Sequence, residues 1–168
     1  MHPHVELALG TIREYVSSGA RPPLPDPLPG DMKLKAGVFV CIKINGELRG
    51  CIGTIEPSRS NLAEEIMDNA VSAAVSDGRF DPLEKKELEN IEVSVDVLSA
   101  PEKVIGVGGL NPEVYGIIVS AGKKKGLLLP DLKGVDTPRQ QIEICRRKGE
   151  IGEDEDIELY RFTVKRYR

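Results

Sequence analysis

The sequence predicts an α+β fold in which helices flank a mainly antiparallel sheet, and three observations predict it. Two apolar, β-branched runs flank an Asn-Gly pair in residues 38–55, which is the pattern of a β-hairpin with a two-residue turn. Residues 91–98 alternate apolar and polar side chains, as a strand with one buried face does. Helical patterns cover residues 2–18 and 61–76. The helices and strands do not alternate regularly along the chain as βαβ units do, so antiparallel strands are expected.

The segment before the hairpin combines a helix with a proline-rich stretch. Residues 2–18 carry an apolar stripe at helical spacing, and Gly19 ends the pattern. His2 and His4 could form a metal-binding pair, but zinc normally takes three or four protein ligands, so no metal site is expected. Residues 21–30 contain five prolines and predict an extended strap that crosses the domain.

The hairpin is the strongest local signal in the chain. With Asn45-Gly46 as its turn, the expected register pairs Val40 with Cys51, and Arg49 and Cys51 share one face. Cys41 then faces the opposite side, so a disulfide between Cys41 and Cys51 would need a different pairing. An odd number of cysteines, three, also favours reduced thiols.

Gly50 and Gly53 bracket Cys51 within the second strand of the hairpin. Glycine weakens a strand unless a chain segment or a ligand must come close to the backbone, so this pattern predicts a site beside Cys51, with Cys51 as a catalytic thiol. The alternative is that the glycines mark a β-bulge and that Cys51 is a small buried apolar residue.

The helix predicted for residues 61–76 begins with a capping-box pattern and ends in a charged turn. Its small face, which carries three alanines, would let another backbone pack closely. In the turn that follows, Arg79 offers a planar fork for a carboxylate or phosphate. Alternatively, Asp77 and Arg79 pair with each other or with the backbone.

The remaining elements complete the predicted sheet. Glu92 lies on the polar face of the strand 91–98, where it could pair with Arg49, act as a base, or remain solvated. Residues 116–129 predict a second hairpin with a basic tip, and residues 137–149 predict a helix with a capping box. Residues 159–167 predict a closing strand.

Composition excludes several classes of partner. The 168 residues are 40% hydrophobic and 30% charged, and no apolar run approaches the roughly 18 residues of a membrane span, so no membrane partner is expected. A net charge of -4, scattered basic residues and 4% aromatic content argue against nucleic acid. The N-terminus does not resemble a secretory signal, which predicts a cytoplasmic location.

Four stretches together resemble one known family. Leu48-Arg49-Gly50-Cys51-Ile52-Gly53-Thr54 resembles the signature of the AMMECR protein family, named after a human Alport-syndrome critical region, whose bacterial members are called protein A of the AmmeMemoRadiSam system. Residues 77–82 resemble the D-x-RF-x-P turn of the family, and residues 87–95 resemble its EL…IEVSV strand. Residues 127–135, with Gln141 and Lys148-Gly149, resemble its C-terminal pattern, so the resemblance covers nearly the whole chain.

The resemblance implies a single domain over residues 1–168, made of two interleaved subdomains. A larger lobe would hold both termini around a sheet, a smaller lobe would be more helical, and the signature hairpin would border a cleft between them. The resemblance also implies two partners, a Memo-like protein similar to ring-opening dioxygenases and a radical SAM enzyme. Members often carry histidine where this chain has Tyr115, so a Cys51-His dyad has little support.

Two functions remain open at the level of the sequence, because the family's own activity is not established. In the first, a cleft binds and acts on a small anionic ligand without a cofactor; Cys51 and Glu92 are catalytic, and the ligand is bound by the residues Arg49, Gly50, Gly53, Thr54, Asp77 and Arg79. In the second, the chain is a non-catalytic adaptor that docks on the two partners. A third option is that the signature only packs the lobes together.

Overall fold

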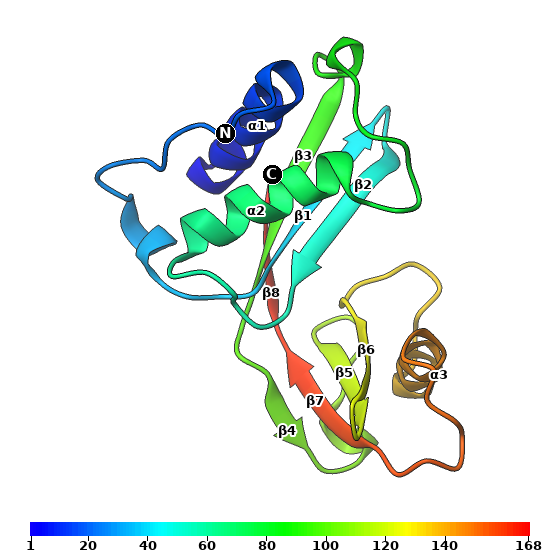
Figure 1. Cartoon of the computed structure of the whole chain (residues 1–168). Helices are drawn as coiled ribbons and strands as arrows, with labels where there is room; N and C mark the ends of the chain where they lie inside the picture. Colours follow the sequence, from blue (N-terminus) through cyan, green and yellow to red (C-terminus); the bar gives the residue numbers. More distant parts are fainter. The chain divides into compact units, whose positions relative to one another are not determined.

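Figure 1 shows the computed structural model, which describes residues 1–168. The chain divides into two compact units, unit 1 (Met1–Leu98 and Lys165–Arg168) and unit 2 (Ser99–Val164). Three α-helices and two four-stranded sheets with antiparallel pairing confirm the predicted α+β class. Unit 1 holds both termini and two of the three helices, so the smaller unit is not the more helical one.

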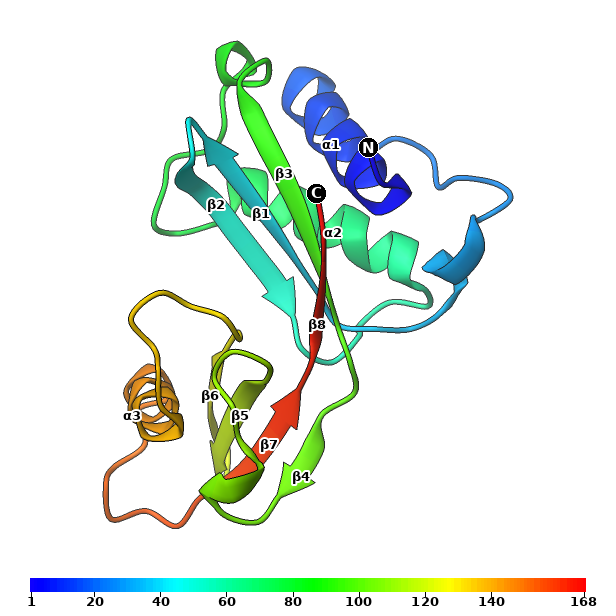
Figure 2. The same ribbon diagram turned by 180° about the vertical axis from the view of Figure 1, so that it is seen from behind.

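Unit 1 is a sheet covered on one face by two helices. Figures 1 and 2 show α1 and α2 on the same side of the sheet, whose strand order is β2-β1-β3-β8. The buried core lies between these layers and includes Ile12, Val40, Ile66 and Val95. Its elements are α1 (Pro3–Ser18), η1 (Gly30–Lys33), β1 (Val38–Ile44), β2 (Glu47–Thr54), α2 (Leu62–Val75), η2 (Lys85–Glu87), β3 (Ile91–Leu98) and β8 (Val164–Tyr167).

Unit 2 packs one helix on a second sheet with the strand order β4-β7-β5-β6. Its core gathers apolar side chains from β5, β6, β7 and α3 around the buried Cys145. The capping box predicted for the helix is present, because Thr137 accepts a hydrogen bond from the Gln140 amide. The elements are β4 (Glu102–Val104), η3 (Val107–Gly109), β5 (Gly116–Ala121), β6 (Lys124–Leu128), α3 (Pro138–Lys148) and β7 (Glu158–Phe162).

The predicted closing strand is interrupted. Residues 158–162 form β7 of the second sheet, whereas residues 164–167 form β8 of the first. The break falls at Thr163, which makes its backbone hydrogen bonds with Ser99 instead of with a strand of either sheet. Its carbonyl accepts from the Ser99 amide (2.9 Å), and its amide donates to Ser99 Oγ (2.8 Å). Alternation alone could not reveal the break, because Thr163 has high strand propensity.

The register of the hairpin differs from the prediction by one residue. Cys51 lies opposite Cys41 instead of Val40, because the pairing shifts between Ile42 and Lys43 and leaves Arg49 as the extra residue of a bulge. A shift of one residue exchanges the faces of a strand, so the two cysteines share a face. Their Cα atoms are 4.2 Å apart and their sulfurs form a disulfide, so the prediction of reduced thiols is wrong for this pair.

Packing accounts for both glycines that bracket Cys51. A Cβ on Gly50 would overlap the carbonyl oxygen of Ala73, so the backbone of α2 lies directly against β2, as the small face of this helix predicted. A Cβ on Gly53 would overlap the ring of Phe39 in β1. The close approach is therefore made by the chain itself at both positions.

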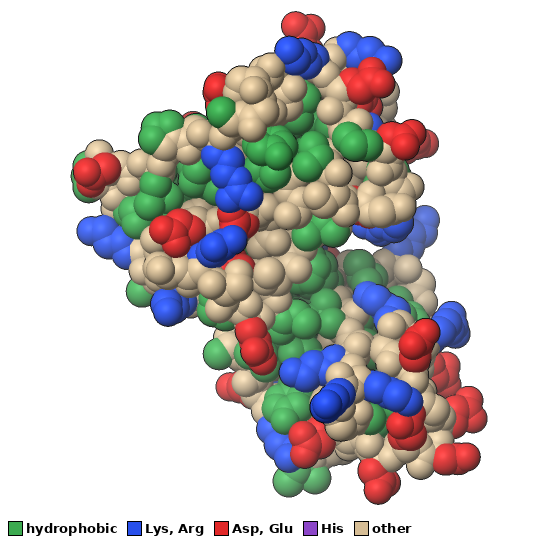
Figure 3. All heavy atoms as spheres, in the orientation of Figure 1, with side chains coloured by type: hydrophobic (Ala, Val, Ile, Leu, Met, Phe, Trp, Pro, Cys, Tyr) green, Lys and Arg blue, Asp and Glu red, His purple; other side chains and the backbone are tan.

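Positive and negative side chains are mixed on one face of the molecule. On the face seen in Figure 3, Lys and Arg side chains are interspersed with Asp and Glu over both units, without a field of one sign. None of the helices combines the length and the apolar character that a membrane span requires.

Candidate functional site

Cys51 lies on β2, the edge strand of the first sheet. On the open side of this strand, the side chains of Asp77 and Arg79 form the hydrogen bonds to Cys51 that a neighbouring strand would otherwise form. The Cα spacing of Cys41 and Cys51 is that of a non-hydrogen-bonded antiparallel pair, so the N–H and C=O groups of Cys51 point away from β1. The Cys51 amide donates to Asp77 Oδ2 (2.9 Å), and Arg79 Nη2 donates to the Cys51 carbonyl (3.3 Å). The charged turn after α2 therefore holds the backbone of Cys51 at both polar groups.

Asp77 and Arg79 also pair with each other. Arg79 Nε donates to Asp77 Oδ1 (2.9 Å) and Nη2 donates to Oδ2 (2.7 Å). The Asp77 side chain is only 5% exposed, whereas that of Arg79 is 58% exposed. Hydrogen bonding to the guanidinium, against an opposing effect of burial, holds the pKa of the Asp77 carboxyl well below its usual range. Of the alternatives left open by the sequence, pairing of Asp77 and Arg79 with each other and with the backbone is the one observed.

Asp77→Asn is expected to lower the free energy of unfolding at pH 7 by about 2 kcal/mol, because the variant loses a charge-assisted pair. The depressed folded-state pKa stabilises the protein above the unfolded value of about 3.9, and this contribution is lost as pH falls below about 4. The variant should therefore lose less stability than the parent between about pH 4 and pH 2. Urea unfolding at both pH values measures this.

Asp154→Asn is the matched control, since Asp154 is an exposed carboxylate. Its effect on stability should be within about 0.5 kcal/mol. An Asp77→Asn variant as stable and as acid-sensitive as the parent would mean that the contact of Asp77 with Arg79 and Cys51 is absent.

Arg49 pairs with Glu87 and not with Glu92, whose pairing with Arg49 was one of the alternatives that the sequence left open. Its Nε and Nη2 donate to the two carboxylate oxygens of Glu87 (2.8 and 3.0 Å), and its Nη1 donates to the Asp81 carbonyl (2.9 Å). The bidentate pair raises the pKa of Arg49 and lowers that of Glu87. Glu92 is exposed on β3 opposite Lys43, and it makes no hydrogen bond to Arg49, Cys51 or Arg79. Arg49 thus ties the segment after α2 to the hairpin.

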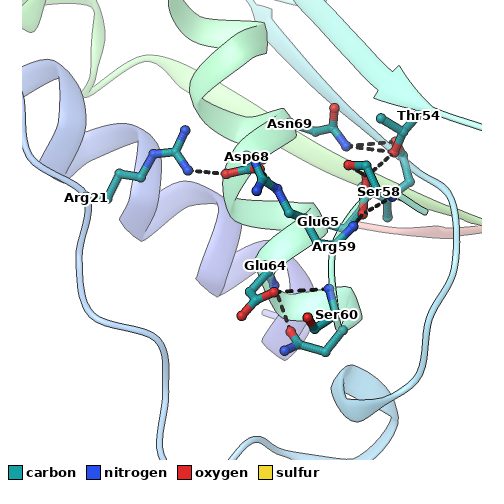
Figure 4. A network of polar contacts seen from close by, with 11 residues as sticks. Arg21, Thr54, Ser58, Arg59, Ser60, Glu64, Glu65, Asp68 and Asn69 are labelled. Atoms are coloured by element: carbon teal, nitrogen blue, oxygen red, sulfur yellow. Dashed lines mark hydrogen bonds and ion pairs between the residues drawn. The ribbon is translucent and has the colours of Figure 1, made fainter. Parts of the chain in front are cut away.

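Thr54 belongs to a buried network on the helix-covered side of the sheet, opposite Val38 (Figure 4). Its hydroxyl donates to Glu65 Oε1 (2.5 Å) and accepts from Asn69 Nδ2 (3.1 Å). The other oxygen of Glu65 accepts from the backbone amides of Ser58 and Arg59 (2.9 and 2.8 Å), and the residue is 1% exposed. The signature threonine therefore helps to order the loop between β2 and α2.

Sequence reasoning missed Glu65 and Asn69, although a signal was present. Both residues fall within the apolar stripe of α2, at helical spacing from Leu62 and Ile66. A carboxylate and an amide inside such a stripe must be buried, and buried polar groups need hydrogen-bond partners. That spacing could have identified the network.

The site therefore consists of Cys51, Asp77 and Arg79, which the structure brings into direct contact. Glu92 is exposed on β3 and lies outside this site. The remaining predicted residues make contacts that hold the surrounding elements together: Gly50, Gly53, Arg49 and Thr54. A model of the AMMECR1 family matches residues 5–167 of this chain. The chain belongs to the AMMECR1 family.

Proteins of the AMMECR1 family from bacteria and archaea are similar to this chain. A Thermotoga maritima protein is 48% identical, covering 99% of this chain and 98% of its own length. A Clostridium acetobutylicum protein is 46% identical over 99% of this chain, which corresponds to only 36% of that longer protein. A crystal structure of an uncharacterized Pyrococcus horikoshii protein matches with a TM-score of 0.86 and 31% identity, covering 97% and 88% of the two chains. The names of these AMMECR1-family relatives state no activity.

Proposed function

We propose that this AMMECR1-family protein binds a small anionic ligand beside Cys51 and acts on it through the Cys51 thiol. Arg79 anchors the anion in this proposal, and Asp77 positions Arg79. The protein works in the cytoplasm with a Memo-like protein and a radical SAM protein, and the reaction depends on these partners. Glu92 has no part in it, because its carboxylate makes no hydrogen bond to Cys51 or Arg79.

One observation carries the proposal: Arg79 lies against Cys51 with part of its guanidinium unused. A guanidinium has five N–H donors, and Asp77 and the Cys51 carbonyl accept from Nε and Nη2 only. The two Nη1 protons are left for an acceptor from outside the chain. Since the side chain is 58% exposed and its position is fixed by the nearly buried Asp77, it supports a preorganised anion contact.

The proposal is tested by comparing an anionic and a neutral reagent at the same thiol. Cys41→Ser leaves Cys51 permanently free, and iodoacetate and iodoacetamide both alkylate a thiolate with loss of iodide. An anchoring arginine should raise the rate for iodoacetate relative to iodoacetamide by up to about fivefold, because exposed charge pairs contribute roughly 0.2–1 kcal/mol. Adding Arg79→Gln should abolish this preference.

Arg139→Gln supplies the matched control. Arg139 is an exposed arginine that also pairs with an acidic side chain, Glu143, at 3.0 Å. Its removal should leave the ratio of the two rates unchanged. If the ratio of the iodoacetate rate to the iodoacetamide rate were the same in Cys41→Ser with and without Arg79, then Arg79 would not anchor anions. That result would contradict this proposal.

The adaptor function is the alternative, and exposed apolar side chains in unit 2 favour it. Ile105 is fully exposed and Val107 is 55% exposed, on either side of Gly106. Neighbouring exposed apolar side chains are typical of protein docking sites. Co-elution of the chain with the Memo-like and radical SAM proteins, lost on Ile105→Asp and without any turnover dependent on Cys51, would favour the adaptor.

A further inference from the structure

Two cysteines that the sequence predicted to be separate thiols are joined across the hairpin. Cys41 lies in β1, between β2 and β3, whereas Cys51 lies in β2 at the edge of the sheet. Both side chains are on the face of the sheet that α1 and α2 leave uncovered, since the intervening Val40 and Ile42 form the core under the helices. Neither residue is fully buried.

The fold holds this hairpin without help from the disulfide. The cysteines are only 10 positions apart in the sequence, and the turn and the strand pairing already close this loop. A cross-link over so short a loop removes less chain entropy than one over a long loop. Besides β1, the backbone of α2 packs on Gly50, and Asp77 and Arg79 hold the backbone of Cys51. The cross-link is therefore not needed as a staple.

The surroundings of Cys51 suit attack by a thiolate. The Arg79 guanidinium lies 3.3 Å from the carbonyl oxygen of Cys51 and is largely exposed, so an approaching anion meets a positive group. On its outer side Cys51 is bordered only by the side chains of Asp77 and Arg79, whereas Cys41 has a strand on each side. Cys145 differs from both, because burial in the core of unit 2 raises the pKa of its thiol to about 12.

We propose that Cys41 and Cys51 form a reversible redox site that exchanges with a reduced dithiol, with Cys51 as the attacked sulfur and Cys41 as the resolving thiol. The inference rests on the proposed function in one respect, because reduction releases the Cys51 thiol that the function requires. Oxidation then seals the same site. In a reducing compartment, a disulfide of this kind is transient and serves catalysis or sensing.

The exchange balances as two displacements. A thiolate of the dithiol attacks Cys51 Sγ, the Cys41–Cys51 bond breaks, and its electron pair leaves on Cys41 Sγ, which takes up a proton. The second thiol of the reductant loses its proton and attacks the reductant's first sulfur, which is bonded to Cys51 in the mixed disulfide. The Cys51 thiolate is expelled and takes up that proton. The reductant ends as a disulfide, and two electrons and two protons reside on the cysteine pair.

The first experiment reduces the native 168-residue chain with excess dithiothreitol and labels it with iodoacetamide, followed by peptide mass spectrometry. Label is expected on Cys41 and Cys51 only after reduction, and on Cys145 only after denaturation. A disulfide that dithiothreitol reduces only in the denatured chain is a static cross-link and overturns the proposal. Labelling of Cys41 and Cys51 without any reductant overturns it too.

The second experiment separates the roles of the two sulfurs with glutathione disulfide as the probe. Cys41→Ser should retain one glutathione on Cys51, whereas the reduced parent should return to the internal disulfide and retain none. Cys51→Ser is the matched variant, and its Cys41 should react at least roughly tenfold more slowly than Cys51 does in Cys41→Ser. Glutathione retained by the parent, or equal rates in the two variants, contradicts the assigned roles.

Failure here can be told apart from failure of the anion proposal. The iodoacetate test uses Cys41→Ser, whose Cys51 thiol is free whatever the redox behaviour of the pair. An unreducible disulfide would therefore leave the preference for iodoacetate intact. Loss of that preference would in turn remove the contribution of Arg79, but the reduction of the Cys41–Cys51 bond by dithiothreitol, which the first experiment measures, would remain.

Discussion

Replacing Gly50 by alanine is expected to lower the free energy of unfolding of unit 1 by about 3 kcal/mol, the upper part of the usual range for overpacking. The new Cβ would overlap the carbonyl oxygen of Ala73, which belongs to the backbone of α2 and cannot rotate away as a side chain can. Relief requires α2 to move off β2, and this separates apolar side chains of the core such as Ile66 and Val40.

Gly10→Ala is the control for the Gly50 experiment. Gly10 lies within α1, and a Cβ there would meet no other atom within 4 Å. Alanine in a helix interior should stabilise the protein by about 0.5–1 kcal/mol, so the two substitutions have opposite signs. Urea unfolding followed by circular dichroism measures both. A Gly50→Ala protein as stable as the parent would mean that α2 does not pack on β2 as closely as described.

The elements that could be predicted are those whose signals are local. Asn61 and Thr137 accept the capping hydrogen bonds expected from their sequence context, and Gly19 ends α1 in the left-handed conformation. The alternation of residues 91–98 likewise predicted β3, which spans these same residues. Each of these signals is contained in a few neighbouring residues, which explains why the α+β class could be predicted.

The register of the hairpin could not be predicted, because it depends on a bulge. An Asn-Gly turn fixes the pairing only near the turn, and the extra residue at Arg49 shifts every later pair by one. The contacts that favour the bulge come from residues distant in sequence. Glu87 and the Asp81 carbonyl bind the Arg49 side chain, and the Ala73 carbonyl leaves no room for a side chain at position 50. The pairing of Cys41 with Cys51 follows from that shift.

The residue types of the candidate site could be predicted from the sequence, but their partners could not, because these partners lie on other elements. Whether Arg79 binds a ligand or pairs within the chain depends on where the turn 77–82 lies in the fold. The turn lies along the edge of β2, so Asp77 and Arg79 contact the backbone of Cys51. The sequence offered only Glu92 as a possible partner of Arg49, whereas the path of the chain after α2 brings Glu87 to it. Long-range contacts of this kind leave no mark on the spacing of residues.

Glu65→Ala is expected to have the largest effect of any single substitution considered, about 4 kcal/mol of unfolding free energy. The carboxylate accepts hydrogen bonds from the Thr54 and Ser58 hydroxyls and from the Ser58 and Arg59 amides (Figure 4). Hydrogen bonds to a charged group contribute roughly 1.5–3 kcal/mol each, although such contributions are not additive within one network. The loop 55–61 would lose the group around which it is ordered.

Hydrogen exchange of the Ser58 and Arg59 amides reads out this loss directly. Both amides should exchange much faster in Glu65→Ala, since their acceptor is gone. Glu65→Gln keeps the shape of the side chain and can still accept from the amides, so it should lose about half as much stability through the missing charge. Stability should therefore decrease in the order parent, Glu65→Gln, Glu65→Ala. The first step measures the effect of the charge of Glu65, and the second measures the effect of its shape.

Glu64→Ala controls for loss of a carboxylate from the same turn of α2. Glu64 is only partly buried, and it accepts a single bond, from the Ser60 amide at 3.1 Å. Its removal should cost less than about 1 kcal/mol and leave the exchange of the Ser58 amide unchanged. If Glu64→Ala and Glu65→Ala were equally mild, the loop before α2 would have to be ordered by something other than the buried carboxylate, and Thr54 would lose its structural role.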